Sequence, residues 1–192
     1  MSHWDEKLSN WCTLPTRKSP ISCAKKNTYL VGVFLGVLGF KPWYYFHMIK
    51  IPYYESSYFV LHNFSAHKVT FEGLIYPTVE HAYHSSKFEN QGIKAEIQNA
   101  ESPLKAYELG QKYKSSRKTN WDEIKVGTLQ RIILEKVRQH TEVRDALIAT
   151  GDEEIVEENP NDDFWGTGKD GRGENQTGKI LMRIRNELLS QV

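Results

Sequence analysis

Cysteine is scarce in this sequence. The chain of 192 residues contains two cysteines, Cys12 and Cys23, and both lie in its first quarter. The rest of the chain therefore has no disulfide and no cysteine-based metal site. Such sparing use of cysteine is typical of proteins in a reducing compartment, so we predict a cytoplasmic location.

An excess of charge of one sign is also absent. The 25 basic and 24 acidic side chains leave a formal net charge of +1. A nearly neutral chain has no overall field that would draw it to nucleic acid or to an anionic membrane. Any phosphate group that the protein binds must therefore be held by a local arrangement of residues.

The apolar run at residues 29–40 is uncharged, but it is shorter than the roughly 20 residues that a membrane-spanning helix needs. Lys25 and Lys26 precede it, as in a signal peptide, yet no small-residue cleavage site follows. We expect residues 1–47 to be an extension outside the fold, without stable membrane association. A targeting segment and an upstream gene start, with Met48 as the true start, are the alternatives.

The remaining residues, 48–192, have the composition of one folded domain. The hydrophobic content of 39% and the aromatic content of 12% are enough for a single buried core. Runs of aromatic and β-branched residues predict strands at 58–61, Val69–Phe71 and Leu74–Tyr76, of which the last two form a small hairpin turning at Glu72-Gly73.

Helices dominate the rest of the domain, which we assign to the mainly α (α+β) class. Apolar periodicity and capping residues predict helices at 77–92, 102–110, 120–140, 141–151 and 179–189. Ser102 and Asn120 are the expected N-caps of the second and third, and Gly110 is expected to end the second. A brief strand is expected at Ile155-Val156.

The first of these helices carries a ridge of polar residues. Glu80, His84 and Lys87 follow one edge of its apolar stripe, at spacings that bring them together. Two interpretations are open: an exposed ladder of weak pairs, or a carboxylate and an ammonium held at the border of a pocket. His81 and His84 have metal-compatible spacing, but no third ligand is apparent, and we predict no metal site.

Glycines recur between Asn161 and Gly178, which is unusual for a helix or a strand. Glycine permits backbone conformations with positive φ and a close approach of a ligand to the main chain. Asp162, Trp165 and Asn175 add a charge, a stacking surface and an amide to the same loop. We interpret it as a binding loop; a solvated connector is the alternative.

Lys136 interrupts the apolar face of the long helix at 120–140. A lysine there must snorkel to solvent, pair with an acid or contact a ligand. We place it in the substrate pocket and keep snorkelling as the alternative.

Several motifs, in a fixed order along the chain, together resemble a known family. They are Asn63-Phe64, Tyr76-Pro77-Thr78-Val79-Glu80-His81, Lys87-Phe88, Trp121, Asn161-Asp162, Phe164-Trp165-Gly166, Asn175 within 171–178, Leu181-Met182 and Arg185. Over residues 51–189 this pattern resembles the NADAR family, also called YbiA-like. The chain departs from the family pattern at His62, Val137 and Thr177, where a serine, an aromatic residue and a leucine are usual.

The resemblance implies a mainly α-helical domain and an N-glycosidase activity. One branch of that family is linked to hydrolysis of phosphoribosylated riboflavin intermediates, and others remove ADP-ribose from guanine. The implied partner is a small phosphoribosyl or ADP-ribosyl substrate, with ADP-ribosylated nucleic acid as a further possibility. No cofactor is implied.

The chemistry of the bond assigns roles to the residues above. Cleavage of a bond between ribose C1′ and nitrogen passes through an oxocarbenium-like centre, which a carboxylate stabilises. Protonation of the base helps it to leave. Glu80 and Asp162 are the predicted catalytic acids, with the roles of acid and base left open. The predicted substrate-binding residues are Lys87, Trp121, Lys136, Trp165, Gly166 and Asn175. A non-catalytic module that binds ADP-ribose or a related nucleotide is the alternative.

Overall fold

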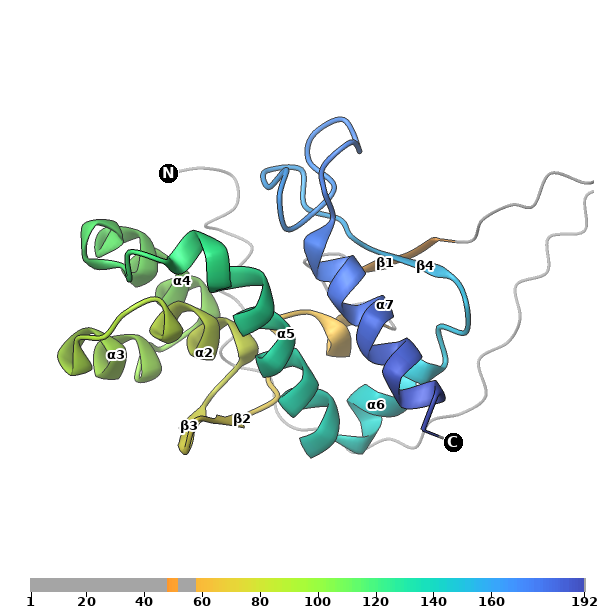
Figure 1. Cartoon of the computed structure of the whole chain (residues 1–192), viewed down its shortest axis with the longest axis horizontal. Helices are drawn as coiled ribbons and strands as arrows, with labels where there is room; N and C mark the ends of the chain where they lie inside the picture. Colours follow the sequence, from red (N-terminus) through yellow and green to blue (C-terminus); the bar gives the residue numbers. More distant parts are fainter. Residues whose placement is uncertain (1–47, 52–57, 192) are drawn as a thin grey trace, which may run out of the picture. The chain divides into compact units, whose positions relative to one another are not determined.

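The computed structural model describes residues 48–51 and 58–191. Over these residues helices dominate, and two short two-stranded sheets complete the fold (Figure 1). The mainly α (α+β) class predicted from sequence is confirmed. Both cysteines and the apolar run at 29–40 lie outside the described residues.

The predicted hairpin is present. Strands β2 (Val69–Phe71) and β3 (Leu74–Tyr76) pair antiparallel, with Val69 opposite Tyr76. The two turn residues, Glu72 and Gly73, have φ values of 50° and 79°. Two successive positive φ angles are the mark of a type I′ turn, whose twist matches that of the strands.

Six α-helices lie in the described part of the chain. They are α2 (Val79–Ser86), α3 (Gln91–Gln98), α4 (Pro103–Lys112), α5 (Trp121–Gln139), α6 (Thr141–Ile148) and α7 (Gln176–Leu189). Thr78 caps α2 by accepting a hydrogen bond from the backbone N–H of His81, and Ser102 caps α4 by accepting one from Lys105. A side-chain oxygen that accepts from the first turn stabilises a helix start, so these two caps fixed the starts of both helices.

Two predicted elements differ from the structure. The segment predicted as a strand at 58–61 is a 3-10 helix, η2 (Phe59–Leu61), because the Ser65 hydroxyl bonds back to the Val60 carbonyl and the backbone closes local turns. The helix predicted to continue to Gly92 ends at Ser86, and α3 begins as a new helix after the Asn90 cap.

One predicted helix end is also wrong. Gly110 lies inside α4, which continues to Lys112 and is followed by the 3-10 helix η3 (Lys114–Ser116). Asn120 is the N-cap residue of α5, as predicted, although its side chain makes no capping hydrogen bond, and α6 begins at Thr141, the first residue of the predicted range. Propensity alone missed the end of α4 because Gly110 serves packing rather than helix termination.

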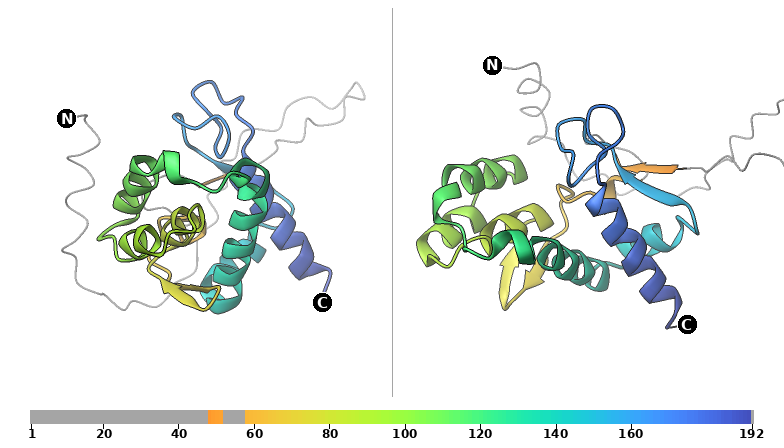
Figure 2. Two further views of the ribbon diagram at one scale, coloured as in Figure 1. Left: turned by 60° about the vertical axis from the view of Figure 1, so that its left-hand side comes forward. Right: turned by 45° about the horizontal axis from the view of Figure 1, so that its top comes forward.

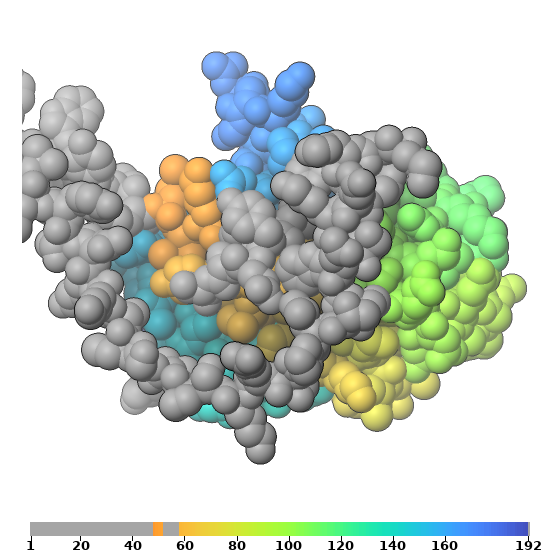
Figure 3. Space-filling view, turned by 180° about the vertical axis from the view of Figure 1, so that it is seen from behind, coloured from red at the N-terminus to blue at the C-terminus, as the bar shows by residue number. Residues whose placement is uncertain are grey.

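A second sheet joins distant parts of the chain. Strand β1 (Met48–Ile51) pairs parallel with β4 (Glu154–Glu157), with Ile51 opposite Glu157. Sequence predicted the second strand but not its partner. In Figure 3 β1, in orange, lies beside the blue segment around β4, and the loop that follows β4 projects at the top of the view.

The long helix α5 lies in the middle of the fold. It contacts β2 and α2 on one side and α6 and α7 on the other, as the views of Figure 2 show. Trp121, Leu129, Ile132, Ile133 and Val137 form its buried apolar face. Because α2 packs against α3, α4 and α5, its polar ridge lies inside the domain.

Candidate functional site

The polar ridge of α2 forms a buried chain of contacts. His84 Nε2 lies 2.9 Å from Glu80 Oε1, and Lys87 Nζ lies 3.0 Å from His84 Nδ1. The exposed fractions of Glu80, His84 and Lys87 are 8%, 2% and 4%. The interpretation as an exposed ladder is therefore wrong, and the ridge is a buried relay of a carboxylate, an imidazole and an amine.

The surroundings set the charge of each group in this relay. Burial alone raises the pKa of Glu80, but His84 and Lys87 outweigh it, so the pKa is lowered overall and the carboxylate is ionised. Burial lowers the pKa of His84, while the Glu80 carboxylate opposes this effect, so the pKa of the imidazole lies below its ordinary value. Burial also lowers the pKa of Lys87 to about 7, which poises the amine for proton transfer near neutral pH.

Gly110 fixes the position of His84. A Cβ atom at this position of α4 would overlap the His84 ring at Nδ1, the atom that contacts Lys87. The glycine therefore allows α4 to pack closely enough to hold the imidazole between its two partners. Sequence analysis treated Gly110 as a helix terminator and missed this role.

Gly110→Ala is expected to lower turnover by at least about tenfold, because the new methyl group displaces the His84 ring and breaks the relay. Overpacking at a buried site also destabilises by about 1–3 kcal/mol. The matched control is Gly127→Ala on α5, where a Cβ atom meets nothing within 4 Å. This control should keep full turnover and gain up to about 1 kcal/mol from helix propensity. Steady-state kinetics and thermal unfolding of both variants measure the difference, and equal kinetics would contradict the role of Gly110.

Aromatic side chains surround the amine of the relay. Lys87 Nζ lies 4.7 Å from the centre of the Tyr83 ring and 6.0 Å from that of Trp121. Trp165 packs edge-on against Tyr83, with ring centres 5.5 Å apart. Trp121 is buried, whereas Trp165 is partly exposed. Trp165 is thus the better placed of the two tryptophans to stack on a flat heterocycle.

The glycine-rich loop brings Asp162 toward the relay. The charges of Asp162 and Glu80 both affect the pKa values of Lys87 and Tyr83 on α2 and at its end. This shared effect places the Asp162 carboxyl near α2. Asp162 Oδ1 accepts hydrogen bonds from the backbone N–H groups of Phe164 (3.0 Å) and Trp165 (2.8 Å). One carboxylate oxygen of Asp162 therefore shapes the loop.

Gly166 and Asn175 hold the loop together. The carbonyl oxygen of Gly166 accepts a hydrogen bond from the Asn175 N–H, and a Cβ atom at Gly166 would crowd Asn159. The Asn175 amide bonds to the backbone of β4: Oδ1 accepts from Glu157 N–H (3.0 Å) and Nδ2 donates to the Ile155 carbonyl (2.9 Å). Both ends of the Asn175 amide thus have partners within the protein, and a contact between Asn175 and the substrate stays a prediction.

Lys136 is bound by the protein itself. Its ammonium donates to the carbonyl oxygen of His62 (3.0 Å) and to Ser65 Oγ (2.6 Å), and the residue is 1% exposed. An ammonium at this depth does not reach solvent, so snorkelling is excluded. These bonds make Lys136 an anchor for the segment after η2, and its place in the substrate pocket stays a prediction.

Lys136→Met should leave turnover within about threefold of the parent and hold or raise the stability. Burial lowers the pKa of Lys136 to about 7, so below this pH the folded protein carries a desolvated ammonium that methionine removes. The gain in the free energy of unfolding is therefore expected to be larger at about pH 6 than at about pH 9. Chemical unfolding at both pH values measures it. A loss of turnover above about tenfold would instead support the predicted place of Lys136 in the substrate pocket.

Sequence analysis missed two cations near the relay. The field of Arg117 acts on the pKa values of His84 and Lys87, and that of Lys125 acts on the pKa of Lys87. Arg117 also lines a hollow of about 210 Å³ together with Asn90, Ser116, Lys118 and Thr119 among others. Lys125 pairs with Asp122 at 3.0 Å, and Arg117 donates to the Gly110 carbonyl oxygen at 3.3 Å, so both cations are positioned by contacts that no sequence motif predicts.

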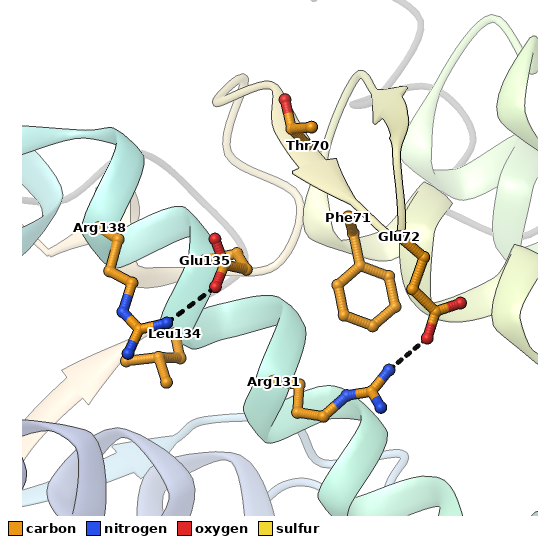
Figure 4. A pocket seen from close by; sticks show the side chains of 7 residues that line it. All are labelled: Thr70, Phe71, Glu72, Arg131, Leu134, Glu135 and Arg138. Carbon is orange, nitrogen blue, oxygen red and sulfur yellow. Dashed lines mark hydrogen bonds and ion pairs between the residues drawn. The ribbon is translucent and has the colours of Figure 1, made fainter.

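A larger hollow, of about 460 Å³, lies between the β2–β3 hairpin and α5 (Figure 4). Arg131 bonds to Glu72 and lies over the Phe71 ring, while Arg138 bonds to Glu135. None of the predicted site residues lines this hollow. Its charged groups are exposed and mutually paired, so it offers less to an anionic substrate than the buried relay does.

Two further findings concern the described part of the chain alone. His81 bonds to Thr78 Oγ1 and to the Ala100 carbonyl, and residues 48–51 and 58–191 contain no cluster of three acids, histidines or cysteines arranged for a metal ion. Within the same residues, no helix combines the length and the apolar character that crossing a membrane requires.

Comparison with known proteins gives consistent similarities. The chain is 36% identical over 140 residues to a riboflavin biosynthesis protein of Vibrio vulnificus, covering 72% of this chain and 38% of that protein. It is 33% identical to the N-glycosidase YbiA of Escherichia coli, of which it covers 88%, and 35% identical to an N-glycosidase of Nostoc punctiforme, of which it covers 91%. These alignments cover 72% and 75% of this chain.

A solved structure resembles the fold described above. The NMR structure of the Escherichia coli protein YbiA matches with a TM-score of 0.68 and 31% sequence identity, over 74% of this chain and 86% of that one. The family model of the NADAR domain matches residues 44–189. The expectation of an N-glycosidase enzyme is thereby confirmed at the level of the class, and the chain belongs to the NADAR domain family.

Proposed function

We propose that this protein hydrolyses the N-glycosidic bond between a ribose and a base-like heterocycle. The observation that carries the proposal is the buried relay of Glu80, His84 and Lys87, near Asp162 and beside a partly exposed Trp165. The proposed substrates are phosphoribosylated aminouracil intermediates of riboflavin synthesis or ADP-ribosylated guanine. The names of the relatives above support the first class.

The overall reaction consumes one water molecule. The bond from C1′ to nitrogen breaks, its electron pair stays with the nitrogen of the base, and the water oxygen bonds to C1′. One proton moves to the departing base, and the water loses one. The site must therefore supply negative charge near C1′ and a proton near the leaving nitrogen.

Glu80 meets the first requirement. It is ionised and buried, so its charge acts in a region of low dielectric on the oxocarbenium-like centre and on the attacking water. The Nε2–H group of His84 fixes the orientation of its carboxylate at 2.9 Å. We propose Asp162 Oδ2 as the second contact to the sugar or water.

Lys87 meets the second requirement. Its pKa of about 7 leaves both protonation states populated near neutral pH, so the ammonium is an effective proton donor to the departing nitrogen. The neutral imidazole of His84 accepts a hydrogen bond from Lys87 at Nδ1, which holds the amine above the Tyr83 ring. We propose Arg117 and Lys125 as the groups that bind the phosphate.

A module that only binds ADP-ribose is the alternative function. Binding a nucleotide needs stacking and phosphate contacts, but it does not need a buried carboxylate connected through an imidazole to an amine of lowered pKa. The relay therefore favours catalysis.

Turnover distinguishes the two functions. The protein is incubated with a phosphoribosylated aminouracil and, separately, with an ADP-ribosylated guanine nucleotide, and released base and sugar are separated by chromatography. Hydrolysis of either substrate supports the proposal. Tight binding of both without any release of base supports the binding module instead.

A further inference from the structure

The hollow of about 210 Å³ that Arg117 lines, which we name the Arg117 hollow, is polar on every side. The connection between α2 and α3 contributes Glu89 and Asn90, and the segment that leads from η3 into α5 contributes residues 116–120. All of these residues have charged or hydrogen-bonding side chains. The hollow is therefore suited to a polar ligand, and not to a flat apolar ring.

Backbone contacts join the Arg117 hollow to the relay. The N–H group of Lys118 donates to the carbonyl oxygen of Lys87 at 2.9 Å. Arg117 Nη2 donates to the carbonyl oxygen of Gly110 at 3.3 Å, and Gly110 packs directly against the His84 ring. Two cations in the wall of the hollow thus adjoin the residues that hold the imidazole and the amine of the relay.

Neither of these two cations is neutralised by an acid of the protein. Among residues 48–51 and 58–191, Arg117 donates to neutral oxygens, one of which is Gln111 Oε1 at 3.0 Å, and the Lys118 ammonium forms no ion pair or hydrogen bond. Lys125, by contrast, pairs with Asp122 at 3.0 Å. Arg117 and Lys118 are also half-buried, so solvent screens their charges less than those of exposed cations. They are the cations best placed to bind an anion.

Neutral donors lie beside the two cations. Ser116 and Thr119 bring hydroxyl groups to the hollow, and the side chain of Asn120 makes no capping hydrogen bond to α5. Several donors around two positive charges match a phosphate group, whose oxygens are strong acceptors. Glu89 is the one acid among the described lining residues, and its carboxylate can accept a hydrogen bond from a sugar hydroxyl.

We propose that the Arg117 hollow binds the phosphate of the substrate together with a neighbouring sugar hydroxyl. Arg117 and Lys118 bind the phosphate oxygens, the hydroxyls of Ser116 and Thr119 donate to them, and Glu89 accepts from the sugar. The phosphate is either the terminal group of a phosphoribosyl substrate or the diphosphate of an ADP-ribosyl substrate. This inference rests on the proposed function, since it assumes a phosphorylated ribosyl substrate, and it adds Lys118 to the residues that determine specificity.

Calorimetric titration with ribose 5-phosphate tests the hollow without requiring turnover. Lys118→Gln removes the charge and keeps the backbone bond to Lys87, so the Kd should rise by at least about fivefold. Arg117→Gln should weaken binding at least as much, and its thermal unfolding is measured because Arg117 also bonds to α4. The matched control is Lys114→Gln, at an exposed cation of η3 that does not line the hollow. Its Kd should stay within about twofold of the parent value.

Glu89→Gln gives a test of opposite sign. Removing a negative charge beside the bound anion should tighten the binding of inorganic phosphate by about twofold or more. The gain should be smaller for ribose 5-phosphate, because glutamine is a weaker acceptor for the sugar hydroxyl. Glu101→Gln, at an exposed acid outside the hollow, is the control and should change neither affinity.

Titration with ADP-ribose distinguishes the two sources of phosphate. If Lys118→Gln weakens the binding of ribose 5-phosphate more than that of ADP-ribose, the hollow holds a terminal phosphate; the reverse order assigns it to a diphosphate. Normal binding to a parent protein that hydrolyses neither proposed substrate would refute the proposed function alone. The inference is overturned if Lys114→Gln weakens binding as much as Lys118→Gln does, if folded Lys118→Gln and Arg117→Gln bind as the parent does, or if the parent binds none of the three probes.

Discussion

Glu80→Gln should lower kcat by about 10²–10³-fold or more and leave the protein folded. Glutamine has the shape of glutamate but no charge, so it can accept the hydrogen bond from His84 without stabilising positive charge at C1′. Because Glu80 is buried and ionised, its charge acts with little screening, and its loss should have a large effect. Steady-state kinetics with the better of the two proposed substrates measure kcat, and calorimetry should show that much of the ligand affinity remains.

The matched control for Glu80→Gln is Glu142→Gln. Glu142 also contacts histidines, with His67 Nε2 at 3.3 Å and His140 Nδ1 at 3.6 Å, but it is 59% exposed in its side chain. Exposed pairs contribute little, so this variant should keep full turnover and nearly full stability. An unchanged kcat in folded Glu80→Gln protein would remove Glu80 from the mechanism.

Lys87→Met should be the second severe variant, with a loss in kcat of at least about 10²-fold. Methionine fills the same buried volume beside Tyr83 and Trp121 but cannot donate a proton to the departing base. Thermal stability should not fall, because burial of the ammonium disfavours its charged form, as the lowered pKa shows. The control is Lys105→Met, which removes an exposed ion pair with Glu108 on α4.

The pH dependence of the parent enzyme gives an independent test of Lys87. The proposed proton donor is the ammonium, which is lost as the pH rises through the pKa of about 7. Turnover should therefore fall on the alkaline side of about pH 7, whereas an ordinary exposed lysine would remain protonated to about pH 10. A rate that stays constant from about pH 6 to about pH 9, with chemistry rate-limiting, would contradict this role.

Local sequence determined the parts of this protein that depend on neighbouring residues. The hairpin turn followed from Gly73, because a glycine tolerates the positive φ that the second central position of a type I′ turn needs. The start of α4 followed from Ser102, because a side-chain oxygen satisfies an unpaired N–H group of the first helical turn. The alignment of Glu80, His84 and Lys87 followed from the period of the helix alone.

Tertiary structure decided whether those aligned residues form a site. The spacing of the α2 ridge is the same whether its face is exposed or covered, and only the packing of α4 at Gly110 and of α5 at Trp121 made it a buried relay. Burial then set the charges, because desolvation lowers the pKa of Lys87 and raises that of Glu157.

Long-range contacts likewise assigned the residues that sequence left ambiguous. Lys136 and Asn175 have side chains suited to a ligand, but each forms hydrogen bonds with the backbone of a distant segment. Lys136 bonds to the His62 carbonyl oxygen, and Asn175 bonds to the backbone of β4. The pairing of β1 with β4 joins residues about a hundred positions apart, and no local pattern encodes that register. The sequence alone thus determined which chemical groups this protein carries and their local geometry. Tertiary packing determined which of these groups lose contact with water, which have hydrogen-bond partners within the protein and which remain for a substrate.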